Sequence, residues 1–324
     1  MEFRSAISKR GKRIVVDGIR VNNFELIITG KLFRKARVKE EWDTDINEPE
    51  DLIRELKSRR VQADFFTFVQ RLPHLIPQFN YRMDLESVAA IPISTYEEWW
   101  TKQVNYRVRT KVRKSIKQGV TVRVVEFNDD LVRGIQDIYN ETPIRQGKPF
   151  WHYGKSFEET KQVNSTYLDR ADFIGAYLGD ELIGFIKLVY ADNYARFMQI
   201  IVKNAYREKA PMNALIAKSV EICAQKGIPF LKYDKLIYGS KGIDTLAEFK
   251  LHNGFRGYDL PRYYIPLSAK GRFALALNLH KGLKAILPRW LAKTALALRK
   301  TYYEKWSGSN RQLSDDDHNT SQDA

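Results

Sequence analysis

The sequence predicts an α/β fold of the α+β kind, in which helices flank a mixed, mostly antiparallel sheet. Three β-rich runs, residues 172–178, 182–190 and 195–203, follow one another with only short turns between them. Turns this short join antiparallel strands, so the three runs form a meander. A helical segment over 211–225 and a β-rich run over 228–233 come next, and a helix between two strands acts as a crossover within a sheet.

Local signals support each of these elements. The turns over 179–181 and 192–193 consist of Gly, Asp, Glu and Asn, and Gly, Asp and Asn are strong turn formers. Pro211 suits the first residue of a helix, because its missing N–H would be unpaired there anyway. Gly227 then ends that helix.

The composition describes a globular, strongly basic chain. Of its 324 residues 44% are hydrophobic, which is enough for a buried core, and the formal net charge is +15. Such an excess indicates either a solvated basic surface or a polyanionic partner, namely nucleic acid, an anionic membrane or a phosphorylated donor. A single cysteine, Cys223, excludes an internal disulfide and fits a cytoplasmic protein. The sequence contains no zinc spacing and no nucleotide-loop motif, so we expect no metal site.

A basic helix is expected ahead of the meander, over residues 96–118. Thr95, or the serine before it, suits the N-cap. Arg109, Arg113 and Lys117 are spaced four residues apart and therefore share one face. That face is either a solvated basic surface or a row of contacts for phosphates or a tRNA backbone.

The loop over residues 140–155 is the most unusual stretch of the chain. It lies between helices that Asn128 and Ser156 are expected to cap. Ordinary loops are small and polar, whereas loops dense in aromatic and ionisable groups more often line sites. The alternative is that the aromatic side chains only pack against the sheet. The residues concerned are Glu141, Arg145, Gln146, Trp151, His152 and Tyr153.

The element order resembles the second half of the GNAT acyltransferase fold. The run from Asp244 to Lys250, followed by residues 252–255 (HNGF), is similar to a short helix and strand start in many GNAT chains. Residues 107–120 look like the basic helix of the Fem-type peptidyl and aminoacyl transferases. The resemblance covers about residues 96–267 and implies a GNAT-like acyl-CoA N-acyltransferase fold.

The resemblance also implies where a donor binds. In GNAT proteins the loop after the third meander strand has the form Arg/Gln-x-x-Gly-x-Gly/Ala, and it holds the pyrophosphate of acyl-CoA at a helix N-terminus. Here Ala210 and Met212 stand where the glycines would be. This departure gives weight to aminoacyl-tRNA as the alternative donor. The residues expected at the donor are Lys203, Arg207, Lys209 and Asn213.

The catalytic and acceptor residues are expected around the 140–155 loop and the end of the 228–233 strand. Glu141 and His152 are candidate general bases by their loop position. Tyr233 and Asp234 close the strand where GNAT chains often place a functional group, and Tyr238 follows. The expected acceptor-binding residues are Arg145, Gln146, Trp151, Tyr153 and Tyr238.

These features predict an N-acyltransferase that moves an acyl or aminoacyl group to an amine, for example in a bacterial cell-envelope or saccharide precursor. The alternative is a non-catalytic basic protein on a GNAT-like scaffold, which binds nucleic acid or a membrane surface. Nucleic acid is expected as a partner of the enzyme only if the donor is tRNA.

We expect four parts along the chain. Residues 1–95 are β-rich and form either a degenerate GNAT half or a simple extension, and residues 96–267 form the GNAT-like domain. Residues 268–306 form basic amphipathic helices that either pack on the core or lie on an anionic membrane, which would place a cytoplasmic protein at the inner membrane. Residues 307–324 are polar and expected to be disordered.

Overall fold

The computed structural model describes residues 2–9, 12–145, 147–236 and 245–281. Within them a twelve-stranded sheet runs through the molecule in the order β1-β2-β3-β4-β5-β14-β6-β13-β12-β11-β10-β7. Its strands are β1 (Glu2–Lys9), β2 (Lys12–Val21), β3 (Phe24–Thr29), β4 (Lys35–Val38), β5 (Phe65–Val69), β6 (Arg82–Pro92), β7 (Val120–Val125), β10 (Ala171–Leu178), β11 (Glu181–Tyr190), β12 (Ala195–Val202), β13 (Phe230–Lys232) and β14 (Arg256–Pro266). Of the described strand pairs in this sheet, β4–β5 and β12–β13 are parallel and the others antiparallel, which confirms the predicted fold class.

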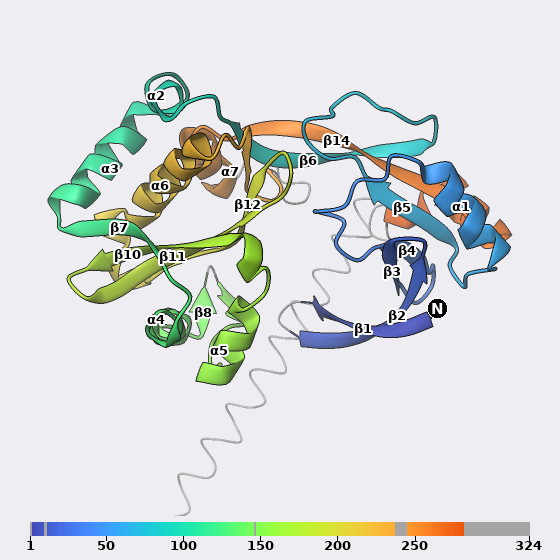
Figure 1. Cartoon of the computed structure of the whole chain (residues 1–324), viewed down its shortest axis with the longest axis horizontal. Helices are drawn as coiled ribbons and strands as arrows, with labels where there is room; N and C mark the ends of the chain where they lie inside the picture. The colour runs from blue at the N-terminus through green and yellow to red at the C-terminus, as the bar shows by residue number, and fades with distance from the viewer. Residues whose placement is uncertain (1, 10–11, 146, 237–244, 282–324) are drawn as a thin grey trace, which may run out of the picture.

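The helices lie on both faces of this sheet (Figure 1). They are α1 (Pro49–Ser58), α2 (Tyr96–Glu98), α3 (Tyr106–Lys117), α4 (Asp129–Asn140), α5 (Phe157–Asn164), α6 (Pro211–Gln225), α7 (Thr245–His252) and α8 (Ala269–Ala276). A π-helical turn, η1 (Trp99–Gln103), three 3-10 turns, η2 (Leu168–Arg170), η3 (Asn204–Lys209) and η4 (Leu279–Lys281), and the short hairpin strands β8 (Ile144–Arg145) and β9 (Lys148–Pro149) complete the described elements.

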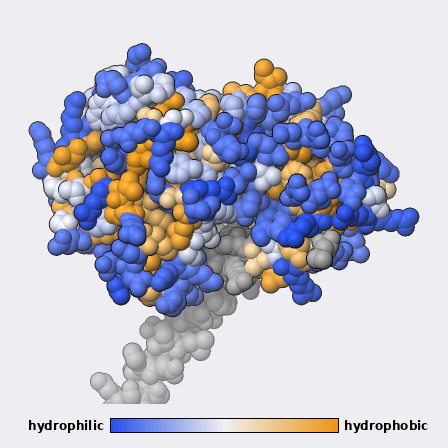
Figure 2. All heavy atoms as spheres, in the orientation of Figure 1, coloured by the Kyte–Doolittle hydropathy of each residue, from blue (hydrophilic) through white to orange (hydrophobic). Residues whose placement is uncertain are grey.

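The molecule has two lobes joined by two long strands (Figure 1). The N-terminal lobe comprises β1 to β5 and α1. The C-terminal lobe comprises β7, β10 to β13 and helices α3 to α7. Strands β6 and β14 are eleven residues long each and bridge the lobes, because β14 pairs with β5 while β6 pairs with both β14 and β13. Hydrophilic residues cover most of the face shown in Figure 2.

The described residues form four apolar cores, three of which hold the layers of the two lobes together. In the N-terminal lobe, Leu52 of α1 packs with Leu26 and Phe66 of the sheet. In the C-terminal lobe, α3 and α6 cover one sheet face, and α4 covers the other through residues such as Ile135. Burying one such side chain contributes roughly 1.5–3 kcal/mol, so both faces of the C-terminal sheet are firmly fixed.

The predicted meander is confirmed by the antiparallel pairing of β10, β11 and β12. The predicted caps are also present, because Asn128 accepts a hydrogen bond from Leu131 N, and Ser156 forms a capping box with Glu159. α5 ends at Asn164. Strands β1 and β4 were not predicted.

The predicted continuous helix over residues 96–118 is wrong. A π-helical turn, η1 (Trp99–Gln103), follows α2, and the chain then leaves helical geometry before α3 starts. The Asn105 side chain caps α3 by accepting from Arg107 N. Arg109 donates to three carbonyl groups at the end of the preceding turn, those of Trp100, Thr101 and Val104. Arg109 therefore satisfies a helix end and is not part of an exposed basic row.

Some expectations fall outside the described residues. They concern Gln146, Tyr238, the tail over 307–324 and the part of the basic helical region beyond Lys281. Among the described helices, none is long and apolar enough to cross a membrane. The four-part division of the chain stays a prediction.

Candidate functional site

The parallel strands β12 and β13 separate almost as soon as they pair. They pair at two positions only, the second of which joins Arg196 to Lys232. The pairing of β12 with β11 also shifts register, which leaves Met198 as an extra, bulged residue. We call this opening the fork. Beyond Arg196 the described sheet places no strand beside β12 on this side, so its backbone is open to pairing with an extended ligand.

A basic loop connects β12 to α6 next to the fork. Lys203 forms a 2.6 Å ion pair with Glu181, and the Tyr206 hydroxyl donates to the same carboxylate at 2.5 Å. These contacts fasten the loop to the turn between β10 and β11, so the Lys203 charge is already paired. Arg207 is exposed and Lys209 half-buried, and neither has an ion pair within the described part of the chain. They remain available to an anion.

The start of α6 has an unusual backbone. Ala210 has φ 55° and ψ 39°, in the left-handed region, and α6 begins at Pro211 with no side-chain cap. This region favours glycine, and Ala210 stands where the first glycine of the GNAT loop was expected. Asn213, predicted at the donor, is buried, and its amide donates to the Asn253 side chain at 3.0 Å. Asn213 therefore links α6 to the end of α7.

Glu141 and Arg145 lie between the 140–155 loop and the end of β12. Glu141 accepts hydrogen bonds from Asn204 N at 2.7 Å, from Ala205 N at 2.9 Å and from Arg145 at 2.9 Å. Arg145 also donates to the Val202 carbonyl. Burial lowers the pKa of Arg145, and the Glu141 charge opposes that shift. The pair links the 140–155 loop to the end of β12, and the Glu141 carboxylate is engaged on both oxygens.

His152 lies against aromatic rings. Its ring stacks on Tyr139 at 4.3 Å and lies 5.4 Å from Phe150. Burial lowers the pKa of His152 to about 4, so its imidazole is neutral at pH 7, as a general base requires. The Tyr139 hydroxyl in turn donates to Gln199 on β12. His152 thus reaches β12 only through Tyr139, and its catalytic role stays a proposal.

The remaining predicted residues divide into exposed and buried ones. Trp151 and Tyr153 are 56% and 48% exposed on the 140–155 loop. Tyr233 is mostly buried, which raises its pKa to about 12. Its carbonyl accepts a hydrogen bond from Lys250, whose ammonium also lies 4.2 Å from the Tyr233 ring. Asp234 follows in the left-handed region at φ 45°. Tyr233 therefore packs against the core beside the fork.

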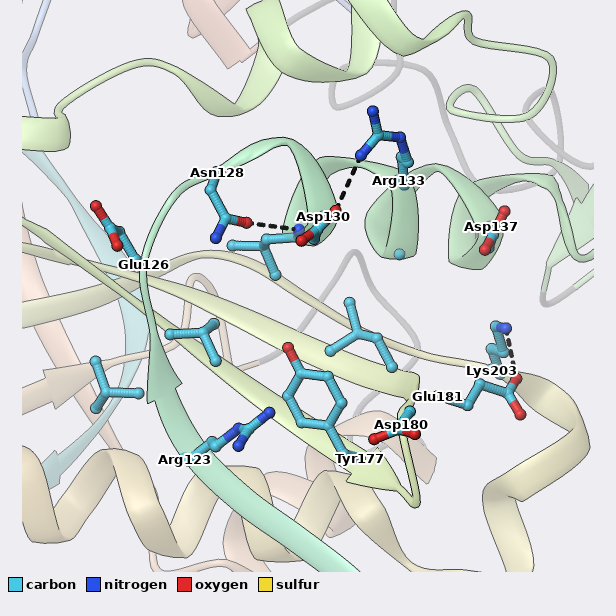
Figure 3. Close-up of a pocket in the computed structure, with 15 residues that line it drawn as sticks. Arg123, Glu126, Asn128, Asp130, Arg133, Asp137, Tyr177, Asp180, Glu181 and Lys203 are labelled. Atoms are coloured by element: carbon cyan, nitrogen blue, oxygen red, sulfur yellow. Dashed lines mark hydrogen bonds and ion pairs between the residues drawn. The ribbon is translucent and has the colours of Figure 1, made fainter.

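A cavity of about 620 Å³ lies between α4, the edge strand β7 and the turn between β10 and β11 (Figure 3). Of the residues predicted for the site it contains only Lys203, which points to Glu181 at one end (Figure 3). Its acidic side chains are exposed to solvent. The charged residues that line it are Arg123, Glu126, Asp130, Arg133, Asp137, Asp180, Glu181 and Lys203. The fork, and not this cavity, is therefore the candidate functional site.

No protein-family model and no curated protein matches the chain, but solved structures do. The C-terminal domain of a protein assigned as a lysylphosphatidylglycerol synthetase, from Agrobacterium fabrum, has a TM-score of 0.54 at 13% identity, over 81% of this chain and 87% of its own. FemX has a TM-score of 0.50 at 10% identity, over 86% and 90%. L-PGS from Bacillus licheniformis has a TM-score of 0.52 at 12% identity, over 78% and 84%.

The chain has a GNAT-like, Fem-type fold. The similarity extends across both lobes, since each match covers more than three quarters of the chain. The loop before α6 is the segment in which the sequence resemblance put the donor residues, and this placement stays a prediction.

An acidic segment of the N-terminal lobe crosses to the C-terminal lobe. We call residues 40–45 the strap. Its Trp42 ring lies 5.2 Å from the Tyr167 ring, and the guanidinium groups of Arg170 and Arg196 lie 5.3 and 5.1 Å from it. The acidic side chains of the strap bind residues outside it: Glu40 binds Tyr167, Glu41 binds Arg262, Asp43 binds Arg170 and Asp45 binds Arg71.

Two residues at the fork were missed by the sequence prediction. Arg196 and Lys232 are basic side chains within otherwise apolar strands, and both lie at the position where β12 and β13 part. A lone basic residue in an apolar strand was the available signal, because such a charge is rarely buried without a reason.

Within the described residues, no group of three or more His, Cys, Asp or Glu side chains is placed to hold a metal ion.

Proposed function

We propose that the chain is an N-acyltransferase, which transfers an acyl or aminoacyl group from a phosphate-bearing donor to an amine. The observation that carries the proposal is the fork, which opens directly before a basic loop and the N-terminus of α6. The open edge of β12 suits an extended donor arm, and the α6 end suits phosphate groups.

The reaction requires attack by the acceptor amine and departure of the donor's leaving group. The acceptor nitrogen attacks the donor carbonyl carbon, the carbon–sulfur bond of a thioester or the carbon–oxygen bond of an ester breaks, and the amine loses a proton. A proton acceptor and a group that stabilises the oxyanion accelerate this step.

A CoA thioester is the donor that the loop fits best. Arg207 and Lys209 supply two unpaired positive charges, which match a single pyrophosphate. Aminoacyl-tRNA is the alternative, because its backbone presents many phosphates. The exposed basic residues Arg113 and Lys117 of α3 would then extend the contact.

We propose an amine of a bacterial cell-envelope or saccharide precursor as the acceptor. A peripheral position at the inner membrane, through the basic region beyond α8, belongs to the same proposal and rests on the sequence of that region.

One observation favours a second candidate, a non-catalytic basic binding protein. The N–H groups of Asn204 and Ala205 at the start of the loop are taken by Glu141. Pro211 lacks an N–H, and the loop contains no glycine. Fewer backbone donors therefore face a pyrophosphate than in the usual GNAT loop.

Titration of the purified chain with coenzyme A and with aminoacyl-tRNA at two salt concentrations tests these proposals. For coenzyme A we expect a shallow salt dependence. For aminoacyl-tRNA we expect a steep one, because each neutralised phosphate releases counterions. The slope of the logarithm of the binding constant against the logarithm of the salt concentration then becomes steeper by roughly 0.7–0.9 for each phosphate contact.

Two matched variants, each of which removes two positive charges, identify the surface used. Arg207→Ala with Lys209→Ala should abolish most coenzyme A binding, whereas Arg113→Ala with Lys117→Ala should leave it unchanged. If tRNA is the donor, the Arg113→Ala, Lys117→Ala variant should bind it with a weaker dependence on salt concentration. Binding of neither donor would favour the non-catalytic candidate.

A further inference from the structure

Arg196 and Lys232 form the last residue pair before the fork opens. They are partners in the parallel ladder of β12 and β13, so their side chains project from the same face of the sheet. Met198, the bulged residue of β12, follows two positions later. A donor that pairs with the open edge of β12 would bring its carbonyl group close to this pair.

The charged groups of Arg196 and Lys232 both contact aromatic rings and do not contact carboxylates. The Arg196 guanidinium lies 5.1 Å from the Trp42 ring, and the Lys232 ammonium lies 5.5 Å from the Tyr194 ring. Neither has a hydrogen bond or an ion pair within the described part of the chain. Yet Lys232 Nζ is not among the fully buried atoms that lack a partner, so it keeps access to solvent.

Two carboxylates whose charges act on Lys232, those of Glu41 and Glu86, are already paired with other cations. Arg262 binds Glu41 through both of its terminal nitrogens at 2.8 and 2.9 Å, and it binds Glu86 at 2.6 Å. Lys235 also pairs with Glu86. The acids of the strap and of β6 therefore leave Lys232 without a direct counter-ion.

The charges that face Lys232 come from four elements. The pKa of Lys232 is lowered to about 8, chiefly by burial and in smaller part by the charge of Arg196 on β12. Glu86 on β6, Asp234 after β13 and Glu41 on the strap act in the opposite direction. At pH 7 roughly a tenth of such amines are unprotonated, far more than for an ordinary lysine.

Lys187 shows that burial alone does not make a lysine reactive. Burial also lowers the pKa of Lys187 to about 8. However, its ammonium donates to the carbonyls of Asn164 and Thr166 and to the Thr166 hydroxyl. All three of its hydrogens are used, so Lys187 anchors the loop after α5, whereas Lys232 at the fork has no such partners.

We propose that neutral Lys232 is the general base of the acyl transfer, an inference that rests on the proposed function. As the acceptor nitrogen bonds to the donor carbonyl carbon, its proton moves to Lys232 Nζ. When the carbon–sulfur or carbon–oxygen bond breaks, the Lys232 ammonium gives that proton to the leaving thiolate or alkoxide. Arg196 is a positioning residue, because its charge keeps Lys232 able to lose its proton.

A labelling experiment tests the state of Lys232 without any donor. Trace acetic anhydride is applied to the full chain across a pH series, and mass spectrometry measures acetylation of each lysine. We expect a Lys232 midpoint near 8, a higher midpoint in Arg196→Gln, and no labelling of Lys187. A Lys232 midpoint near the ordinary value of about 10.4, or no labelling at any pH, overturns the proposal.

Transfer kinetics test the role itself. Lys232→Met should lower kcat by about 10²–10⁴-fold with little change in KM, and Lys232→Arg should not restore it. The acidic limb of the wild-type pH–rate profile should move to higher pH in Arg196→Gln. Lys57→Met, an exposed lysine of α1, is the control, and thermal melting checks that each variant folds.

The outcomes separate the two proposals. If the wild-type chain transfers an acyl group and Lys232→Met transfers it equally fast, Lys232 is not the base although the function holds. If the wild-type chain transfers nothing from either donor while Lys232 still titrates near 8, the acyl-transfer function fails, and the base role fails with it.

Discussion

Glu141 accepts hydrogen bonds from two backbone N–H groups and from Arg145, and these contacts stabilise the local structure. Both side chains are mostly buried, since 17% of the Glu141 side chain and 14% of the Arg145 side chain are exposed. A carboxylate engaged on both oxygens has little capacity left for a substrate proton. The pair ties the end of α4 to the loop that leads into α6, and the catalytic role of Glu141 stays a prediction.

Replacing Glu141 distinguishes a structural role of this side chain from a role as general base. We expect Glu141→Gln to lower the free energy of unfolding by about 1.5–3 kcal/mol, because hydrogen bonds to a charged acceptor are lost. Arg145→Met should have a similar effect, and the double variant should cost less than the sum. Urea denaturation measures all three. A variant of normal stability that has lost 10²–10⁴-fold in rate would instead restore Glu141 as the base.

At the scale of elements, the start of α6 combines a strained residue with a missing cap. Ala210 adopts the left-handed conformation, which costs a residue with a Cβ roughly 1–2 kcal/mol. α6 nevertheless begins here, because Pro211 suits the first helical position and the buried side of the helix packs on the sheet. Tertiary packing thus holds a backbone shape that a glycine would adopt without strain.

Ala210→Gly should therefore stabilise the chain or leave it unchanged. The relief of strain is offset in part by the greater freedom of glycine in the unfolded chain, so we expect a gain of up to about 1 kcal/mol. The matched control is Ala217→Gly in the interior of α6, which should lose at least about 0.5–1 kcal/mol. Denaturant titration compares them. A clear loss in Ala210→Gly would show that the conformation is not strained.

At the scale of the whole molecule, one sheet and one strap connect the lobes. β6 and β14 carry backbone hydrogen bonds from one lobe to the other. The strap adds Trp42, which contacts Tyr167, Arg170 and Arg196 of the C-terminal lobe. The lobes are therefore expected to unfold together.

Trp42→Ala should weaken this coupling. Loss of the partly buried ring and its two cation–π contacts should cost about 2–4 kcal/mol. Calorimetry should show one transition for the wild-type chain and a broader or divided one for the variant. Trp151→Ala is the control, since Trp151 is 56% exposed and its loss should change stability by less than about 0.5 kcal/mol. Identical melting curves for wild type and Trp42→Ala would show that the strap does not couple the lobes.

The elements that the sequence predicted well are those with local causes. Short turns define the meander, Asn128 and Ser156 cap their helices, and Pro211 begins α6. The helix over 96–118 was wrong because a π-helical turn and the Asn105 cap interrupt it, and its break is stabilised partly by Arg109. Strand β4 was missed because it has only four residues, two of them basic, although it pairs with β3 just before it and with β5 some thirty residues further along the chain.

The features of the candidate site also divide into those with local causes and those that depend on tertiary contacts. The sequence by itself determined the order of elements and the basic loop after β12, because backbone sterics and alternation act between near neighbours. Only the tertiary structure decided which polar groups are available. Glu141, Arg145, Lys203 and Asn213 have partners within the protein, whereas Lys232 contacts the Tyr194 ring and has no hydrogen bond or ion pair in the described part of the chain. Burial and ion pairing depend on residues far apart in the chain, such as Glu41 with Arg262, and no local pattern encodes those distances.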